Sequence, residues 1–215
     1  ASTEYLFFEH CARRIREVIP NAKILMVLRN PIERAYSAYC YQLRDGLESL
    51  PFKEALHQEE KRVRERWRVG WFYRRAGYYY EQVNRYYQAF EHHNIKIILW
   101  KDLHHNTRQT CAEVFEFLGV DPQFVPELSR ANQSAIPRHR PLNRAVFQNK
   151  SLKKRLHDLL PDLVYRSMSR TLKQFVYAPK QPLKSDVRAC LKSQYYDDIL
   201  KLEDLTDLDL SHWKR

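Results

Sequence analysis

The chain has 215 residues, of which 44% are hydrophobic and 13% aromatic, and its formal net charge is +11. This composition argues against a disordered chain, and no apolar run reaches the roughly 18 residues that a membrane-spanning helix needs. The positive charge favours an anionic partner such as nucleic acid, an acidic membrane surface or a phosphorylated cofactor.

The N-terminal residues and the cysteines suggest where the protein works. The first ten residues, A-S-T-E-Y-L-F-F-E-H, have neither a basic lead nor a long apolar region, so we expect no signal peptide. The four cysteines are far apart in the sequence and form no C-x-x-C pair. We therefore expect reduced thiols and a cytoplasmic location. The four are Cys11, Cys40, Cys111 and Cys190.

The first two predicted elements are a helix and a strand. Residues 5–19 have apolar side chains at helical spacing and predict an amphipathic helix, followed by a turn at Pro20. Residues 23–28 form a short apolar run, which predicts a strand covered on both faces.

A second helix is expected directly after this strand. Asn30 suits the N-cap, Pro31 takes the first helical position, and Glu33 stands where its side chain can reach back to the cap. Gly46 is expected to end the helix. The apolar face is formed by Ile32, Ala35, Tyr36, Tyr39, Cys40 and Leu43.

The junction between this strand and helix is the first candidate site. Arg29 follows the carboxyl end of the strand, where open α/β sheets bind ligands and where the helix points its positive end. Arg29 can offer a fork of donors to a phosphate, and Ser37 a hydroxyl. An ordinary turn with a surface arginine and a helical serine is the alternative. The segment has no Gly-rich loop, so it is not a nucleoside triphosphate P-loop.

Residues 48–68 are almost wholly charged after a small apolar start. Their favoured interpretation is a solvated helix with Glu–Lys and Glu–Arg pairs four residues apart. The alternative is a mobile arm or lid near an acceptor site.

Residues 69–90 hold nine aromatic side chains, with a helix predicted after Gly77. Most of these rings are expected in the core. Tyrosines beside Arg74 and Arg75 can alternatively form a stacking platform for an adenine or a single-stranded base.

Residues 95–100 predict a second strand, so that strand, helices and strand form a parallel crossover. Residues 107–118 predict an amphipathic helix closed by Gly119. Two histidine pairs flank the second strand without metal-ligand spacing, and we interpret them as loop residues.

The C-terminal third contains one long irregular stretch and two predicted helices. Residues 121–144 hold four prolines and the basic residues Arg138 and Arg140, and long ordered loops of this kind are often functional. A basic linker is the alternative. Residues 147–170 and 183–202 predict helices.

Several motifs together resemble sulfotransferases that use 3′-phosphoadenosine-5′-phosphosulfate (PAPS), in particular bacterial and heparan-sulfate-type members. The segment R-N-P-x-x-R-A-Y-S after an apolar strand is similar to their 3′-phosphate-binding segment. A-S-T-E-Y-L, G-x-Y-x-E-Q, V-F-E-F-L-G-V-D-P and L-x-x-L-x-D-L-D-L-S-H-W follow in the family's order over nearly the whole chain.

The resemblance implies a cofactor site and a fold. Arg29 and Ser37 would hold the 3′-phosphate of PAPS or of its product, 3′-phosphoadenosine-5′-phosphate. Tyr80, or next Tyr79, would pack on the adenine, and Arg138 and Arg140 would close over the phosphate. The implied fold is α/β, with a P-loop-NTPase-like parallel sheet flanked by helices, and no metal is required.

Two strands buried on both faces do not make a stable sheet, so further strands are expected. By the resemblance, residues 1–215 are a single, N-terminally incomplete domain that lacks the strand and loop for the 5′-phosphosulfate. The catalytic base implied by the family would precede Ala1, so no catalytic residue is identified in this chain.

The resemblance implies sulfuryl transfer to a hydroxyl or amine of a small-molecule or carbohydrate acceptor, with no nucleic-acid partner. Two alternatives stay open. One is a basic, aromatic-rich module that binds RNA or another polyanion without catalysis. The other is a phosphoryl-transferring kinase of related fold, against which the missing G-x-x-x-x-G-K-[ST] motif counts.

Overall fold

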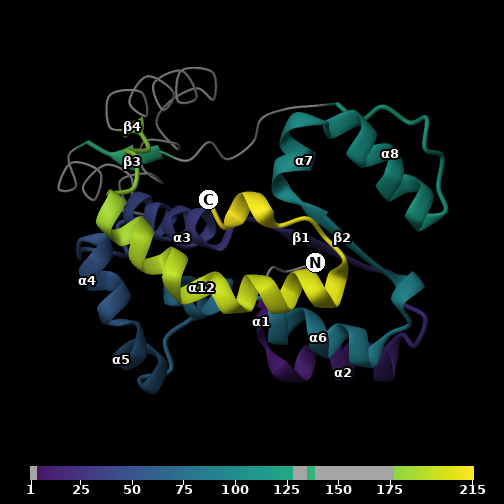
Figure 1. Cartoon of the computed structure of the whole chain (residues 1–215), viewed down its shortest axis with the longest axis horizontal. Coiled ribbons are helices and arrows are strands. Elements are labelled where there is room, and N and C mark those ends of the chain that lie inside the picture. The colour runs from purple at the N-terminus through teal and green to yellow at the C-terminus, as the bar shows by residue number, and fades with distance from the viewer. Residues whose placement is uncertain (1–3, 128–134, 139–176) are drawn as a thin grey trace, which may run out of the picture. The chain divides into compact units, whose positions relative to one another are not determined.

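The protein is described here from a computed structural model, which describes residues 4–127, 135–138 and 177–215 (Figure 1). The helices are α1 (Glu4–Phe7), α2 (Glu9–Val18), α3 (Pro31–Arg44), α4 (Phe52–His57), α5 (Glu59–Arg64), α6 (Tyr80–Ala89), α7 (Trp100–His105), α8 (Thr107–Leu118) and α12 (Ser185–Thr206). The strands are β1 (Ile24–Leu28), β2 (Ile95–Leu99), β3 (Ala135–Pro137) and β4 (Tyr177–Pro179). Short 3₁₀ turns cover Val69–Trp71, Arg75–Gly77, His92–Asn94 and Ser211–Trp213.

The chain forms two compact units. The first contains Ala1–Arg34, Arg74–Ser129 and Ala189–Arg215, and the second contains Ala35–Tyr73 and Arg130–Arg188. Two of the four boundaries fall inside helices, one in α3 and one in α12.

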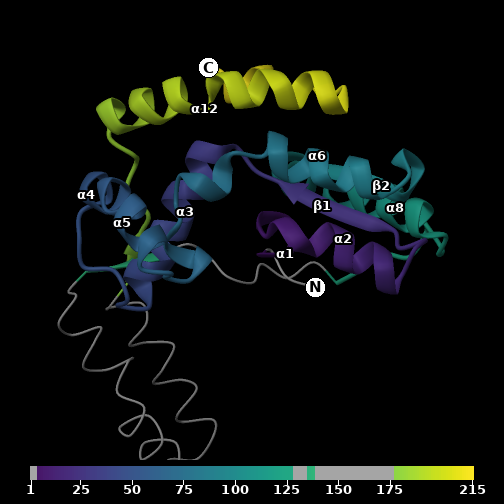
Figure 2. The ribbon, with the colours of Figure 1, turned by 90° about the horizontal axis from the view of Figure 1, so that it is seen from below.

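The first unit is built on the parallel pair β1 and β2. Their register runs from Ile24 opposite Ile95 to Leu28 opposite Leu99, as the predicted crossover requires. The helix α6, which lies between the two strands in the sequence, packs beside α2 (Figures 1 and 2). After the second strand, α7 and α8 pack on each other and on β2.

One face of β1 differs from the prediction. Met26 and Leu28 are buried, but Leu25 and Val27 on the opposite face are 41% and 47% exposed. The alternation follows from the period of two in a strand. The expectation of a strand covered on both faces is therefore wrong for β1 as it stands in this structure.

The predicted first helix is broken at Phe8, whose backbone is extended between α1 and α2. Side chains from α6 hold this break. The Arg85 Nη2 donates to the carbonyl oxygens of Leu6 and Phe7, at 3.2 and 3.1 Å, and the Tyr86 hydroxyl donates to the carbonyl oxygen of Tyr5 at 2.9 Å. These long-range bonds satisfy carbonyl groups that the continuous helix would have used, which explains the error.

Both predicted glycine ends of helices are confirmed. After α3, Gly46 has a φ of 65° and its N–H donates to the carbonyl oxygen of Leu43. After α8, Gly119 has a φ of 78°. Glycine adopts this left-handed conformation without a steric cost, which is why it ends helices.

The C-terminal part of the first unit is a helix with a buried face. This helix, α12, ends at Thr206, and the 3₁₀ turn that follows it at Ser211–Trp213 buries Trp213. The Tyr195 hydroxyl donates to the carbonyl oxygen of Arg74 at 2.8 Å. A Cβ on Gly77 would lie only 2.7 Å from that hydroxyl, so this turn needs a residue without a side chain.

In the second unit, the stretch expected to be irregular contains a strand. β3 pairs with β4 in antiparallel register, with Ile136 opposite Ala178. β3 contains Pro137. In a sequence, a proline argues against a strand, because it has no N–H group to donate to the neighbouring strand. The predicted helix over residues 147–170 lies outside the described residues. Within the described ranges, no helix has the length and apolar character needed to span a membrane.

Candidate functional site

The carboxyl ends of β1 and β2 bring Arg29 and Trp100 together. Because Leu28 lies opposite Leu99 in the parallel register, the residues that follow the two strands leave the sheet at the same edge. The guanidinium carbon of Arg29 lies 4.3 Å from the centroid of the Trp100 ring. This distance is typical of a cation–π contact.

The N-terminus of α3 begins at this edge and is capped as predicted. Asn30 Oδ1 accepts hydrogen bonds from the backbone N–H groups of Ile32 at 3.0 Å and Glu33 at 3.3 Å. The cap fixes the first turn of the helix, whose positive end therefore lies next to Arg29.

The second half of the predicted capping box is wrong. The Glu33 carboxylate bonds to Arg29 instead of the cap, with Oε2 accepting from Nε at 3.3 Å and from Nη2 at 3.2 Å. A guanidinium is a charged double donor and a stronger partner for a carboxylate than a single backbone N–H.

The start of α6 is tied to the same edge by Tyr79. Its hydroxyl donates to the carbonyl oxygen of Arg29 at 3.0 Å, and its buried ring packs against Trp213. Burial raises the pKa of the Tyr79 phenol, against the lowering effect of Arg34 and Arg29. Tyr79 is therefore a neutral core residue that links α6 to the end of β1.

Asp198 in α12 supplies the acceptor for the start of α6. Its carboxylate accepts from the N–H groups of Tyr79 at 2.7 Å and Tyr80 at 3.3 Å. Burial raises the pKa of Asp198, although these two N–H groups and Lys201 oppose the shift. Tyr80 is half-buried, and the Lys201 ammonium lies 5.8 Å from its ring centroid.

The predicted cofactor residues divide between the two units. Arg29 and Tyr80 are in the first unit, where the Tyr79 bond connects their segments. Ser37 lies half-buried in α3, and Arg138 is exposed after β3, with its Nε donating to the Tyr177 carbonyl oxygen at 3.2 Å; both belong to the second unit. Arg140 lies outside the described residues.

Three side chains at this site were not predicted as site residues. Trp100 had a signal, since an aromatic residue directly after the second parallel strand must reach the same edge as Arg29. Glu33 had a signal in its spacing of four residues from Arg29. Asp198 had none, because it is 119 residues from its partner Tyr79.

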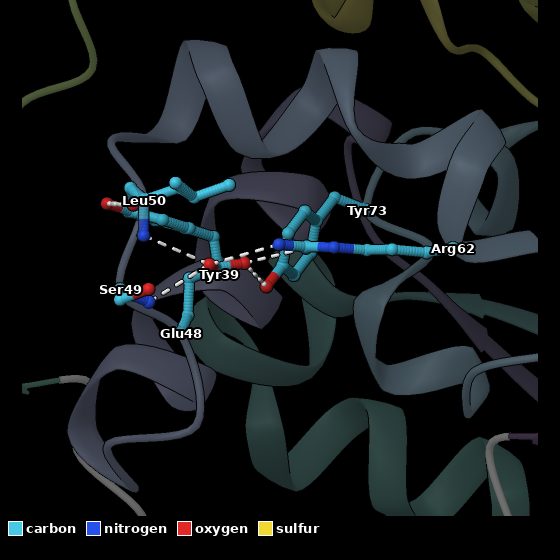
Figure 3. A network of polar contacts seen from close by, with 6 residues as sticks. All are labelled: Tyr39, Glu48, Ser49, Leu50, Arg62 and Tyr73. Carbon is cyan, nitrogen blue, oxygen red and sulfur yellow. Dashed lines mark hydrogen bonds and ion pairs between the residues drawn. The ribbon is translucent and has the colours of Figure 1, made fainter. Parts of the chain in front are cut away.

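A second polar cluster lies in the second unit and is centred on Glu48 (Figure 3). Arg62 Nη1 donates to Oε2 at 2.7 Å and Nη2 donates to Oε1 at 3.1 Å, while the Tyr73 hydroxyl donates to Oε2 at 2.8 Å. The backbone N–H groups of Ser49 and Leu50 donate to Oε1 at 3.0 and 3.1 Å. All five donors converge on one carboxylate.

This cluster corrects the interpretation of residues 48–68 as a solvated helix. The segment forms two short helices, and both Glu59 and Arg62 are buried. Burial would raise the pKa of Glu48, but the bonds from Arg62, the Leu50 N–H and Tyr73 outweigh it and lower that pKa. The predicted pairing four residues apart does occur on the surface, between Lys61 and Glu65.

The histidine, cysteine and acidic side chains of the described ranges form neither a metal cluster nor a disulfide. No group of three or more His, Cys, Asp or Glu side chains among the described residues has an arrangement suited to a metal ion. All four cysteines are described, and they are free thiols.

With this geometry in view, comparison with known proteins identifies the family. Residues 16–154 match the family described as "Sulfotransferase domain". The chain belongs to the sulfotransferase family. No curated protein matches the sequence.

A solved sulfotransferase supports the fold. The crystal structure of a sulfotransferase from Alicyclobacillus acidocaldarius matches with 31% sequence identity and a TM-score of 0.75. The match covers 100% of this chain and 66% of that one, so the chain spans just under two thirds of the length of its neighbour. The sulfotransferase match includes Arg29, Glu33, Tyr80 and Trp100, whereas Asp198 lies beyond it.

Proposed function

We propose that this sulfotransferase chain binds PAPS and 3′-phosphoadenosine-5′-phosphate, with Arg29 as the main ligand of the 3′-phosphate. The observation that carries the proposal is the position of Arg29 at the carboxyl edge of β1 and β2, beside the capped N-terminus of α3. Both features favour an anion, because the guanidinium and the helix end are positive.

The state of Arg29 supports this role. Its side chain is 24% exposed, and Glu33 uses only Nε and Nη2. Within the part of the chain that the structure describes, Nη1 has no hydrogen-bond partner. An arginine with one free donor group at an accessible edge is suited to a phosphate.

The proposal includes four further cofactor residues. Tyr80 is a better candidate than Tyr79 for packing on the adenine, because Tyr79 is buried and its hydroxyl is bonded to Arg29. Ser37 would add a hydroxyl to the 3′-phosphate site, and Arg138 and Arg140 would add positive charge. A single domain with a P-loop-like fold remains part of the same proposal.

The proposed reaction is transfer of a sulfuryl group to a hydroxyl or amine of a small-molecule or carbohydrate acceptor. PAPS, when bound, would supply that group: its sulfur would gain a bond to the acceptor oxygen or nitrogen and lose its bond to the 5′-phosphate oxygen, while the acceptor O–H or N–H would release its proton to a base or to water. The role derived for this chain is to hold the nucleotide by its 3′-phosphate through Arg29. We assign no catalytic base among its residues.

Calorimetric titration tests the proposal. The chain is titrated with 3′-phosphoadenosine-5′-phosphate and with adenosine 5′-phosphate, which lacks the 3′ group. We expect a clear preference for the first nucleotide, and Arg29→Ala should lower its affinity by about 10- to 100-fold, because one or two charge-assisted hydrogen bonds are lost. Arg108→Ala is the matched control, since Arg108 is an exposed arginine of the same unit.

The opposite result has a clear meaning. A chain that is folded by circular dichroism but binds both nucleotides equally would overturn the 3′-phosphate site. If affinity then fell steeply with salt for any polyanion, a general anion-binding function would replace the proposal.

A further inference from the structure

Arg29 is held on two sides by residues of its own unit. Trp100 lies against the guanidinium, with 4.3 Å between the guanidinium carbon and the ring centroid. Glu33 holds the edge formed by Nε and Nη2 through one carboxylate oxygen, at 3.3 and 3.2 Å. A planar group that is fixed on one face and along one edge has few orientations left.

Both holding residues are themselves fixed. Glu33 sits in the first turn of α3, whose N-cap Asn30 bonds to the Glu33 N–H. Trp100 begins α7, and the His104 ring, one turn further on, stacks on the indole with 4.8 Å between centroids and 12° between planes. The positions of the Glu33 carboxylate and the Trp100 ring, which hold the edge and the face of the Arg29 guanidinium, are therefore set by secondary structure.

The arrangement leaves one part of Arg29 available. Nη1 has no hydrogen-bond partner among the described residues, while Nε and Nη2 face Glu33. An arginine side chain loses much rotamer freedom when it binds a ligand, and ordering it beforehand reduces that loss. Holding Arg29 in advance should therefore increase its affinity for a phosphate.

We propose that Trp100 and Glu33 are positioning residues that orient the Arg29 guanidinium for the 3′-phosphate of the nucleotide. This inference rests on the proposed function, since it assigns how Arg29 is prepared for that ligand. It predicts that both residues act through Arg29 and not through contacts of their own with the phosphate.

The alternative role for Glu33 is that of a competitor, which the phosphate must displace from Arg29. The two roles predict opposite signs. A positioning carboxylate that is removed weakens binding, whereas a competing carboxylate that is removed strengthens it. Glutamine at position 33 keeps the size of the side chain and one acceptor oxygen, so it should preserve most of the positioning effect.

The test measures the affinity ratio between 3′-phosphoadenosine-5′-phosphate and adenosine 5′-phosphate by calorimetry. Trp100→Leu should lower this ratio by about 3- to 10-fold, as expected from the loss of a partly exposed cation–π contact. Trp100→Phe should restore it to within about 2-fold, because phenylalanine keeps an aromatic face. Glu33→Ala should lower it by about 2- to 5-fold and Glu33→Gln by less.

Two controls separate positioning from other effects. Trp67→Leu removes a comparable tryptophan, which lies 5.2 Å from the Arg62 guanidinium in the other unit, and should leave the ratio unchanged. Trp100→Leu combined with Arg29→Ala should bind both nucleotides as Arg29→Ala alone does. A further loss of affinity for both nucleotides in the double variant would mean that Trp100 contacts the nucleotide directly, and would overturn the positioning role.

The outcomes distinguish this inference from the function on which it rests. If the unaltered chain shows no preference for the 3′-phosphate, or Arg29→Ala keeps it, the proposed function fails. If Arg29→Ala abolishes the preference but Trp100→Leu leaves it intact, only the positioning role fails. A loss in Trp100→Phe as large as in Trp100→Leu, with both variants folded by circular dichroism, also overturns it. Tighter binding by Glu33→Ala would make Glu33 a competitor.

Discussion

Two arginines of this sulfotransferase-family chain have the same kinds of partner but differ in their capacity to bind a further ligand. Arg29 and Arg62 each pair with a glutamate and lie against a tryptophan ring, at 4.3 and 5.2 Å. Arg62 gives both Nη atoms to the two oxygens of Glu48, and its side chain is 7% exposed. Arg29 gives Nε and Nη2 to one oxygen of Glu33 and is 24% exposed.

The difference shows that burial and saturation, not residue type, separate the closed Arg62 pair from the accessible Arg29 pair, which we propose binds a phosphate. Glu48 receives five hydrogen bonds, so its ion pair with Arg62 is complete and closed to ligands. Removing one member of such a buried pair leaves an uncompensated charge. The Glu33–Arg29 pair is accessible to water, which screens it and lets an incoming anion approach.

The largest expected effect breaks the closed pair. Arg62→Ala should lower the free energy of unfolding by about 3–5 kcal/mol, because the buried Glu48 carboxylate loses its counter-charge. Urea denaturation followed by circular dichroism measures this. Arg64→Ala, at an exposed position of the same helix, should change it by no more than about 0.5 kcal/mol. If Arg62→Ala lowered the free energy of unfolding by less than about 1 kcal/mol, the Arg62–Glu48 pair would be no stronger than a solvent-exposed ion pair.

The pH dependence of the same pair sharpens the comparison. Because the pKa of Glu48 is lowered from its ordinary value of 4.5, its contribution to stability is complete above that value and is lost as the pH falls through the lowered pKa. The stability advantage of the unaltered chain over Glu48→Gln should therefore be larger at about pH 7 than at about pH 3. Glu54→Gln, at an exposed position, is the control. An advantage that is constant with pH would contradict the buried ion pair.

A smaller effect is expected where the candidate site is supported from a distance. Asp198→Ala removes the acceptor for the N–H groups of Tyr79 and Tyr80 and should cost about 1–2 kcal/mol, comparable to the loss of a helix N-cap. Thermal or urea unfolding measures this cost. The neighbouring exposed Asp197→Ala should be close to neutral. Equal effects of the two variants would show that Asp198 does not hold the start of α6.

The smallest effect on stability is expected at Arg29. Arg29→Ala should change the free energy of unfolding by no more than about 1 kcal/mol, since its ion pair is partly exposed. In the same variant the preference for the 3′-phosphate should disappear, so stability and binding should separate. A stability loss as large as that of Arg62→Ala would remove the contrast between the two arginines.

Much of the fold near the candidate site could be predicted from local patterns. The apolar run before Arg29, the Asn30 cap and the glycine at the end of α3 all specify their structure within a few residues, and the structure confirms them. Local patterns misjudged Glu33 because two partners were in reach, and the stronger donor was the arginine.

The errors fall where partners are distant in the sequence. Arg62 looked like a surface residue because its neighbours are charged, yet it is 14 residues from Glu48 and buried with it. Tyr79 was the second candidate for the adenine contact, and the structure buries it, with its N–H bonded to a carboxylate from α12 and its hydroxyl bonded to the carbonyl group of Arg29. No local periodicity contains such information.

The sequence by itself determined the two parallel strands, the capped helix after β1 and the arginine between them, because hydrophobic period, capping and glycine conformation act over a few residues. Only the tertiary structure decided that Trp100 lies against Arg29, because that contact follows from the register of two strands about seventy residues apart in the chain. The tertiary structure also decided that Arg62 is buried in a complete ion pair, whereas Arg29 is partly exposed. Burial depends on how the whole chain packs, so the Arg62 guanidinium is a buried structural support, whereas the Arg29 guanidinium is partly exposed and is the group that we propose binds the 3′-phosphate.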